Sequence, residues 1–357
     1  MILTVVTRLS PLLALAWMSA VPAPAGMVES GGWSCNVEGA TEDAPGVSVE
    51  RVAWLMGTEM RAVACADSRW AGLLALEAAF TEVRHVESRL STWLEDSELS
   101  RLNSTPPGQW ADISRSTLDL LEEVRDWAKA TDGAFDPAVG ALLDAWDMRG
   151  RGKVPEATEL DRALEVTGIE HVELDPSNGR ARRLRAVRLD AGAFGKGAGL
   201  RAAANSLAAS GVRSAVLEFG GQIEIVSSAR DNTRWTVDVA DPVNRDETAV
   251  RLHVGRASSI ATTGASERFV EVDGQKLGHV IDPRDGHPVP AWGSATVVAA
   301  DAVTADVLST ALFVMGAEAA ENWSRDLDVG VLLLSGSGAE RVVFQNEALR
   351  MMETSGW

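Results

Sequence analysis

The stretch from Leu189 to Gly221, LDAGAFGKGAGLRAAANSLAASGVRSAVLEFGG, constrains the fold of this chain more than any other part of the sequence. Residues 186–189 are expected to end a β-strand, and glycines at 192, 195, 197 and 199 follow directly. An alanine-rich helix comes next, Gly211 suits its C-terminal end, and Val212 to Phe219 is expected to form a second strand. This order predicts a fold that combines helices with a sheet.

The glycine-rich turn has two interpretations on its own residues. Backbone N–H groups at a helix N-terminus can hold an anion, and Lys196 would add a mobile positive charge. Alternatively, the glycines only allow a tight βαβ connection to pack. A Walker A loop is excluded, because that motif needs four residues between its first glycine and its Gly-Lys pair, and Gly192 and Gly195 have two between them.

Charge narrows the choice of ligand. The 357 residues carry a formal net charge of −18 at pH 7. Nucleic acids and anionic membrane surfaces require a basic face, so neither is expected as a partner. A ligand that carries phosphate must therefore be held by local donors or by a metal ion.

The N-terminus resembles an export signal. Arg8 precedes a short apolar stretch at residues 11–21, and Ala23-Pro24-Ala25 offers a cleavage site. We expect residues 1–25 to be a signal peptide, residues 26–49 to be a linker, and the protein to act in the periplasm or on the outer face of the cytoplasmic membrane. Cys35 and Cys65 would both remain after cleavage, and their spacing does not show whether they pair.

The remaining pattern predicts an α+β fold, with mixed sheets and packed helices in one continuous catalytic domain over residues 50–357. A hairpin is expected at 49–65 with its turn near Gly57, and a second at 171–189 with its turn at 176–179. Helices are expected at 70–90, 114–131, 159–166, 302–313 and 318–323. Further strands are expected at 235–239, 249–254, 259–262, 269–272, 295–299 and 329–334.

Two polar patterns could carry chemistry. Asp306 and Thr310 are four residues apart, so on a helix they share one face, and hard cations such as Mg²⁺ prefer oxygen ligands of this kind. Helix capping and surface polarity are the alternative.

His279 precedes a turn at Pro283-Arg284-Asp285-Gly286, where it would be a general base or a polar strand end. No H-E-x-x-H or G-x-S-x-G motif occurs, which disfavours zinc hydrolases and serine hydrolases.

Taken together, these segments resemble the FAD:protein FMN transferase family, also called the ApbE or flavin transferase family. The resemblance is carried, in order, by six blocks: residues 55–58, 91–103, 134–146, 189–221, 279–288 and 305–312. It implies a fold related to the T-fold. It also implies an enzyme that cleaves FAD with Mg²⁺ and attaches FMN to a threonine of an acceptor protein, of the kind found as a subunit of redox complexes.

The resemblance also assigns roles to single residues. FAD contacts are expected at Met56, Thr92, Trp93, Leu94, Ala134, Phe135, Asp136, Asp190, Lys196 and Ile281. The Mg²⁺ site is expected at the carbonyl of Ala193 with Asp306, Ser309 and Thr310, and His279 is expected to be the base for the acceptor hydroxyl.

The chain departs from the family pattern in three places. Residues 190–197 read Asp-Ala-Gly-Ala-Phe-Gly-Lys-Gly where Asp-Leu-Gly-Gly-Ile-Ala-Lys-Gly is usual. Asp285 stands where a threonine is usual, and Gln222 stands where an acidic residue or asparagine is common. Two alternatives to the transferase therefore stay open: an FAD pyrophosphatase that releases FMN and AMP, and a flavin-binding protein without turnover.

Overall fold

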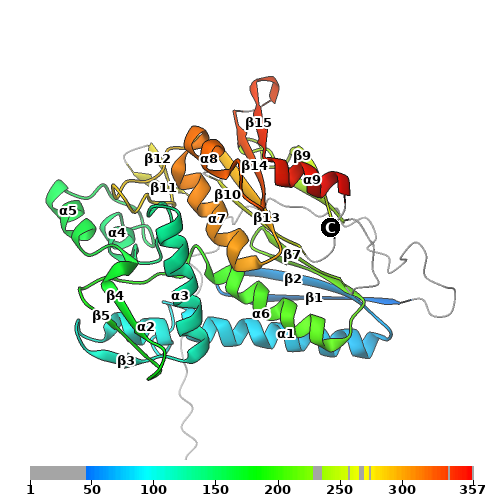
Figure 1. Cartoon of the computed structure of the whole chain (residues 1–357), viewed down its shortest axis with the longest axis horizontal. Helices are drawn as coiled ribbons and strands as arrows, with labels where there is room; N and C mark the ends of the chain where they lie inside the picture. Colours follow the sequence, from blue (N-terminus) through cyan, green and yellow to red (C-terminus); the bar gives the residue numbers. More distant parts are fainter. Residues whose placement is uncertain are drawn as a thin grey trace, which may run out of the picture.

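A computed structural model describes residues 46–227, 235–255, 258–264, 269–272, 275–336 and 338–355. Its centre is an eight-stranded sheet in the order β1-β2-β6-β7-β10-β13-β14-β15, in which neighbouring strands are antiparallel (Figure 1). These strands are β1 (Val47–Leu55), β2 (Thr58–Ala66), β6 (Ser214–Phe219), β7 (Gln222–Ser227), β10 (Ser258–Gly264), β13 (Gly293–Ala299), β14 (Gly330–Ser335) and β15 (Val342–Gln345).

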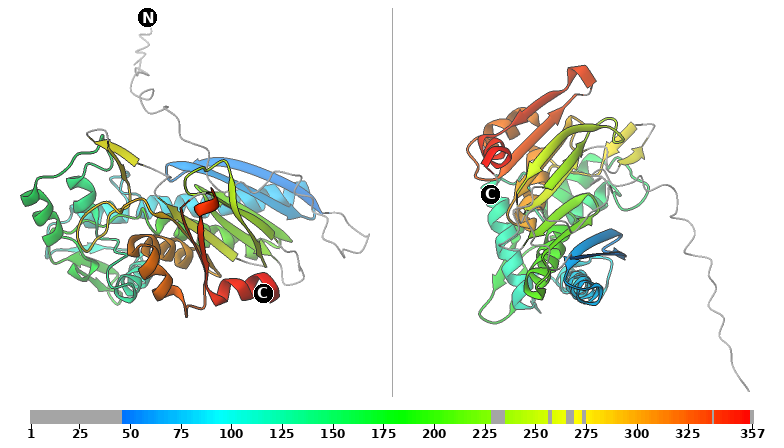
Figure 2. Two further views of the ribbon diagram at one scale, coloured as in Figure 1. Left: turned by 90° about the horizontal axis from the view of Figure 1, so that it is seen from above. Right: turned by 90° about the vertical axis from the view of Figure 1, so that its right-hand side faces the viewer.

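Three helices cover one face of this sheet: α1 (Arg69–Leu90), α6 (Gly195–Ser210) and α7 (Ala302–Met315) (Figures 1 and 2). The other face is covered by the hairpin of β8 (Trp235–Ala240) and β9 (Thr248–Val254) and by α9 (Glu347–Ser355). Because β7 lies between two layers, its side chains are buried on both sides. Ile223 and Ile225 pack towards β8 and β9, whereas the side chain of Gln222 reaches the carbonyl of Ala302 at the start of α7.

A smaller region lies at one end of the helix layer (Figure 1). It contains α2 (Glu98–Ser104), β3 (Trp110–Asp112), α3 (Arg115–Ala130), α4 (Gly140–Ala145), α5 (Ala157–Glu165), the 3₁₀ turn Ile169–His171, β4 (Val172–Asp175) and β5 (Arg180–Arg183). Its core includes Leu99, Leu118 and Leu121, and it continues onto α7 through Val303 and Val307. The small hairpin of β11 (Phe269–Val272) and β12 (Gln275–Gly278), α8 (Ala317–Ser324) and the 3₁₀ turn Gly338–Glu340 complete the described elements.

The α+β class expected from the sequence is confirmed, and so are most of its elements. The first hairpin turns at Met56 and Gly57, where both φ angles are positive, at 46° and 75°. Gly211 ends α6 in the left-handed region with a φ of 78°. The first strand begins at Val47, two residues before the hairpin expected at 49–65. The expected signal peptide, most of the linker and Cys35 lie outside the described residues.

The strand expected at residues 186–189 is wrong. The second strand of that hairpin is β5, and residues 187–190 form no strand. Their backbone groups are bonded elsewhere: both the N–H and the carbonyl of Leu189 bond to the side chain of Asn103, and the N–H of Asp190 donates to the carbonyl of Pro137. With no strand before α6, and with β6 antiparallel to both neighbours, the βαβ interpretation of the glycine-rich turn is wrong as well.

None of the helices in the described ranges is long and apolar enough to cross a membrane.

Candidate functional site

Asp306 lies where the N-terminus of α6 meets α7. Its side chain is 4% exposed. One carboxylate oxygen accepts a hydrogen bond of 2.8 Å from the N–H of Gly197, and the other lies 3.3 Å from the Nζ of Lys196. A β-carbon at position 197 would lie 2.5 Å from the carbonyl oxygen of Ala302, so only glycine lets the two helices approach this closely. The start of α6 therefore binds a carboxylate through one backbone N–H group, that of Gly197, and through Lys196.

Two hydroxyl groups follow Asp306 on α7, as the helical spacing predicted. The hydroxyls of Ser309 and Thr310 lie 3.0 and 3.3 Å from the backbone carbonyl of Asp306. Thr263 of β10 joins them from the sheet, with its hydroxyl 2.9 Å from that of Ser309 and 3.4 Å from that of Thr310. Nothing local in the sequence pointed to Thr263, because its partners lie about fifty positions away along the chain.

These donors suit Mg²⁺ better than a transition metal. Among the described residues there is no group of three or more His, Cys, Asp or Glu side chains that would hold a metal ion. The oxygen donors on α7 are one carboxylate and two hydroxyls. Ala193 lies just before α6, and its carbonyl as a further donor stays a prediction. Mg²⁺ typically takes one or two carboxylates and completes its octahedron with waters and substrate phosphates, so this sparse set of oxygen donors fits it.

A second cluster lies around Asp190, at the other end of the same turn. One oxygen of Asp190 accepts a 2.8 Å hydrogen bond from the N–H of Gly192, and the other forms an ion pair with Arg149. The same Nη2 atom of Arg149 lies 3.0 Å from the hydroxyl of Thr92. The guanidinium also lies 5.5 Å from the ring centre of Trp93. Three residues expected to contact FAD are thus joined by an arginine that the sequence analysis missed.

Trp93 and Leu94 are large apolar side chains on the surface, 74% and 45% exposed. They follow the C-terminal end of α1 in a short irregular segment before α2. An exposed tryptophan with a cation close to its ring is a suitable platform for a planar ligand.

Met56 is placed against the start of α6. A β-carbon on Gly195 would lie 3.2 Å from the terminal methyl of Met56, and one on Gly199 would lie 3.6 Å from its sulfur. The backbone N–H of Met56 donates a 2.8 Å hydrogen bond to Glu87 of α1. This bond helps to hold a non-glycine residue at a positive φ in the hairpin turn.

Ala134, Phe135 and Asp136 lie in the interior, with exposures of 0%, 1% and 9%. The carboxylate of Asp136 accepts hydrogen bonds from the N–H groups of Ala138, at 2.7 Å, and Ile169, at 3.0 Å. Burial raises the pKa of Asp136 from 3.8 to about 6, against the lowering effect of these two bonds. In this structure Asp136 joins two loops, and the FAD contacts of all three residues stay predictions.

His279 follows β12, is half-buried, and leads into a well-defined turn. Ile281 is buried against Leu142 and Trp146, and it forms an isolated bridge with Pro288. Asp285 accepts a 2.9 Å hydrogen bond from the N–H of His287. The carboxylate that departs from the family pattern therefore has a role within the turn.

The turn is anchored to the smaller region of the molecule. Trp146, which directly follows α4, donates a 2.7 Å hydrogen bond from its indole N–H to the carbonyl of Gly286. The φ of Gly286 is +75°, and a β-carbon there would lie 2.8 Å from Leu160. The segment that carries His279 and Ile281 is thus fixed against α4 and α5.

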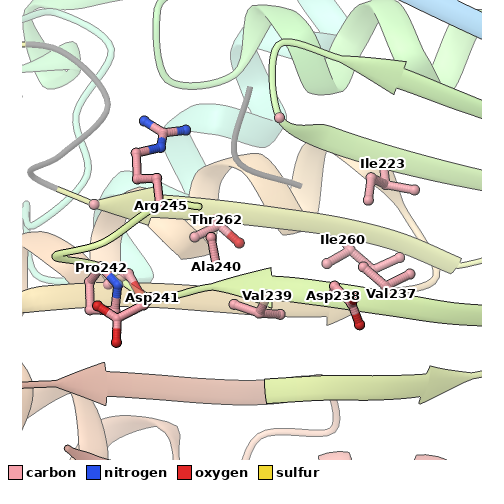
Figure 3. Close-up of a pocket in the computed structure, with 13 residues that line it drawn as sticks. Ile223, Val237, Asp238, Val239, Ala240, Asp241, Pro242, Arg245, Ile260 and Thr262 are labelled. Atoms are coloured by element: carbon pink, nitrogen blue, oxygen red, sulfur yellow. The ribbon is translucent and has the colours of Figure 1, made fainter. Parts of the chain in front are cut away.

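A small pocket, open to solvent, lies elsewhere, between β8 and the main sheet (Figure 3). Ile223, Val237 and Ile260 form its apolar wall. Its lining includes Thr262, whose neighbour Thr263 faces α7 on the other side of the sheet. None of the residues expected from the sequence to contact FAD or the metal lines this pocket.

Known proteins are similar to this chain in sequence and in fold. The model of the ApbE family matches residues 56–333. The FAD:protein FMN transferase of Vibrio cholerae is 30% identical over 240 residues, which cover 66% of this chain and 72% of that protein. The FAD:protein FMN transferase of Treponema pallidum is 32% identical over 260 residues, which cover 68% of this chain and 72% of the relative.

Two solved structures extend the comparison. The crystal structure of the ApbE protein of Thermotoga maritima superimposes with a TM-score of 0.78 at 28% identity, covering 86% of this chain and 99% of that one. The apo form of the Pseudomonas stutzeri flavinyl transferase ApbE gives a TM-score of 0.76 at 23% identity, covering 89% of this chain and all of that one, and so supports the shared fold.

Proposed function

This chain belongs to the ApbE family, and from that membership we propose that it transfers FMN from FAD to a threonine of an acceptor protein and releases AMP. The relatives it matches over two thirds of their length are named for FMN transfer from FAD. The observation that carries the proposal is the position of Asp306, which sits on the N-terminus of α6 beside Lys196 and one turn before Thr310.

The reaction exchanges one P–O bond for another. The threonine oxygen attacks the phosphorus of the FMN half, a phosphoester bond forms, and the phosphoanhydride bond to AMP breaks with its electrons on the AMP oxygen. The hydroxyl is a poor nucleophile until a base takes its proton, and His279 is the base in our proposal. Lys196 and the N-terminal amides of α6 supply positive charge to the pyrophosphate of FAD.

We include Mg²⁺ in this proposal because the oxygen donors described above suit it. Asp306, Ser309, Thr310 and the carbonyl of Ala193 would hold it, with the phosphates of FAD completing its coordination. When bound, the ion would neutralise charge on the pyrophosphate and on the departing AMP. In this structure the Nζ of Lys196 lies 3.3 Å from Asp306. A cation bound to Asp306 would repel it, and its flexible side chain would let it turn to the phosphates of FAD.

Met56, the segment Thr92 to Leu94, Asp190 and Ile281 hold the rest of FAD in this proposal. The exposed ring of Trp93 offers a face for one of the planar ring systems of FAD. The acceptor is a protein that presents a threonine, of the kind that serves redox complexes. We also propose that transfer takes place after export, because the export signal precedes the domain in the sequence.

The test combines the full chain, FAD, Mg²⁺ and an acceptor domain of an ApbE substrate, with a Thr→Val acceptor as the matched control. We expect fluorescent flavin on the acceptor band of a denaturing gel, no label on the valine acceptor, and none after chelation of Mg²⁺. AMP without label would make the chain an FAD pyrophosphatase. Neither AMP nor label would leave only a flavin-binding protein.

A further inference from the structure

Arg149 is the cationic side chain of the Asp190 cluster, and the sequence analysis gives it no role. Its guanidinium contacts three residues that the proposed function places around FAD: an ion pair with Asp190, a 3.0 Å hydrogen bond to Thr92, and a contact with the ring of Trp93. These partners come from two segments almost one hundred residues apart. The arginine therefore joins two parts of the site directly through their side chains, in addition to the backbone link between Asn103 and Leu189.

The loop that presents Arg149 is firmly held. Gly150 and Gly152 donate backbone hydrogen bonds of 3.0 and 3.1 Å to the carbonyl of Asp147, and Lys153 donates one of 2.9 Å to Trp146. Asp147 itself adopts a positive φ of 48°, and its carboxylate accepts a 3.0 Å bond from the N–H of Arg151. Arg149 thus projects from a defined loop, and its side chain is 28% exposed while that of Asp190 is 14% exposed.

The charges around the site explain why Asp190 needs Arg149 as its partner. FAD carries a negative pyrophosphate, and the chain has a formal net charge of −18. Asp190 without a partner would repel such a ligand and, at 14% exposure, would be poorly screened by water. Lys196 is engaged by Asp306 at the other end of the turn, so Arg149 is the cation that neutralises Asp190.

We infer that Arg149 is a positioning residue for FAD: its guanidinium neutralises Asp190 and holds Thr92 and Trp93 in one arrangement. Because these three contacts restrain the side chains, less conformational freedom is lost when the nucleotide binds. The inference rests on the proposed function, since it takes FAD as the ligand. It predicts an effect on FAD affinity and a smaller one on the chemical step.

The experiment compares Arg149→Met and Arg149→Lys with the unaltered full chain. Methionine keeps the length of the side chain and removes the charge, while lysine keeps a charge without the planar fork. We expect Arg149→Met to raise both the Kd for FAD, followed by flavin fluorescence polarisation, and the KM for FAD by roughly tenfold. Turnover at saturating FAD should change by less than about twofold, and lysine should recover part of the affinity.

Arg188→Met is the control, because Arg188 also forms an ion pair, with Asp144, which lies outside this cluster and is more exposed. It should leave FAD affinity unchanged. The inference is overturned if Arg149→Met leaves the Kd unchanged, if Arg188→Met weakens binding equally, or if only turnover falls. A wild-type chain that binds FAD without labelling an acceptor would reject the proposed transfer and leave the test of Arg149 intact, whereas a wild-type chain that binds no FAD rejects both.

Discussion

Among single residues, Asp306 is the one on which the proposed metal site depends most. It is buried, it accepts a hydrogen bond from the start of α6, and it is the one carboxylate of the proposed metal site. Asp306→Asn keeps an oxygen for the N–H of Gly197 but removes the charge. We expect FMN transfer to fall by roughly a hundredfold or more, while the circular dichroism spectrum stays that of the native fold.

Asp326→Asn, at an exposed position after α8, is the control for that substitution and should retain full activity. Wild-type turnover in Asp306→Asn would reject the assignment of this carboxylate to the metal.

A second prediction concerns Thr263, and the neighbouring Thr262 provides its control. Thr263→Val removes the hydroxyl that contacts Ser309 and Thr310, whereas Thr262→Val removes one that contacts Thr296 at 2.9 Å. Groups that orient metal ligands typically affect metal affinity by about ten- to a hundredfold. We expect Thr263→Val to raise the Mg²⁺ concentration for half-maximal activity by about tenfold, and calorimetric titration should show the same weakening. An equal shift in Thr262→Val would show that the hydroxyl of Thr263 has no special role.

The same residues show how far local pattern predicts a site. Asp306 and Thr310 were predictable, because helical geometry fixes the face that they share. Thr263 and Arg149 were not, because their partners are brought to them by the packing of β10 on α7 and by the loop after α4. Asp285 departs from the family pattern, and only the structure shows that its carboxylate accepts a hydrogen bond from His287 within its own turn.

At the scale of elements, the crossing of α6 and α7 determines the geometry of the proposed metal site. Gly197 and Gly199 both lie in α6, but their surroundings differ. A β-carbon on Gly197 would meet backbone atoms of α7 at 2.5 and 2.8 Å, while one on Gly199 would meet only side chains, at 3.4 Å or more. Glycine is also unfavourable inside a helix by about 1 kcal/mol relative to alanine.

We therefore expect opposite outcomes from the same substitution. Gly197→Ala should lower the free energy of unfolding by about 2 kcal/mol, because α7 must move away, and it should abolish most of the transfer activity. Gly199→Ala should be neutral or slightly stabilising and remain active. Urea unfolding and the labelling assay measure both effects. Equal stability of the two variants would contradict the close approach of the helices.

The strand wrongly expected at residues 186–189 shows what an alternating pattern can predict for an element. Its apolar alternation is real, since Val187 and Leu189 are buried. The backbone, however, is bonded to Asn103, Gly140 and Arg183 rather than to a neighbouring strand. Alternation reports which side chains are buried, and it does not identify the partner of the backbone.

For the whole molecule, two buried acids predict how stability depends on pH. Burial raises the pKa of Glu224 from 4.5 to about 8 and that of Asp136 from 3.8 to about 6. The folded state thus holds these protons to a higher pH than the unfolded chain does. Their contribution to stability is present in full below about pH 4 and is lost as the pH rises through about 6 and then about 8.

Glu224→Gln isolates this effect, because glutamine imitates the protonated acid. The variant and the wild type should have similar free energies of unfolding near pH 5, and the variant should be more stable by a few kcal/mol near pH 9. Urea unfolding at the two pH values measures the difference. A difference that does not depend on pH would show that Glu224 ionises as an ordinary carboxylate.

In the proposed function, FMN is transferred to a threonine rather than to water at the site where α6 crosses α7. One reaction of the full chain with FAD, Mg²⁺ and acceptor decides between the two, when chromatography counts the AMP released and mass spectrometry counts the threonine labelled. We expect one AMP for each FMN-threonine, and loss of both products in Asp306→Asn. AMP in large excess over labelled threonine, or full labelling by Asp306→Asn, would contradict it.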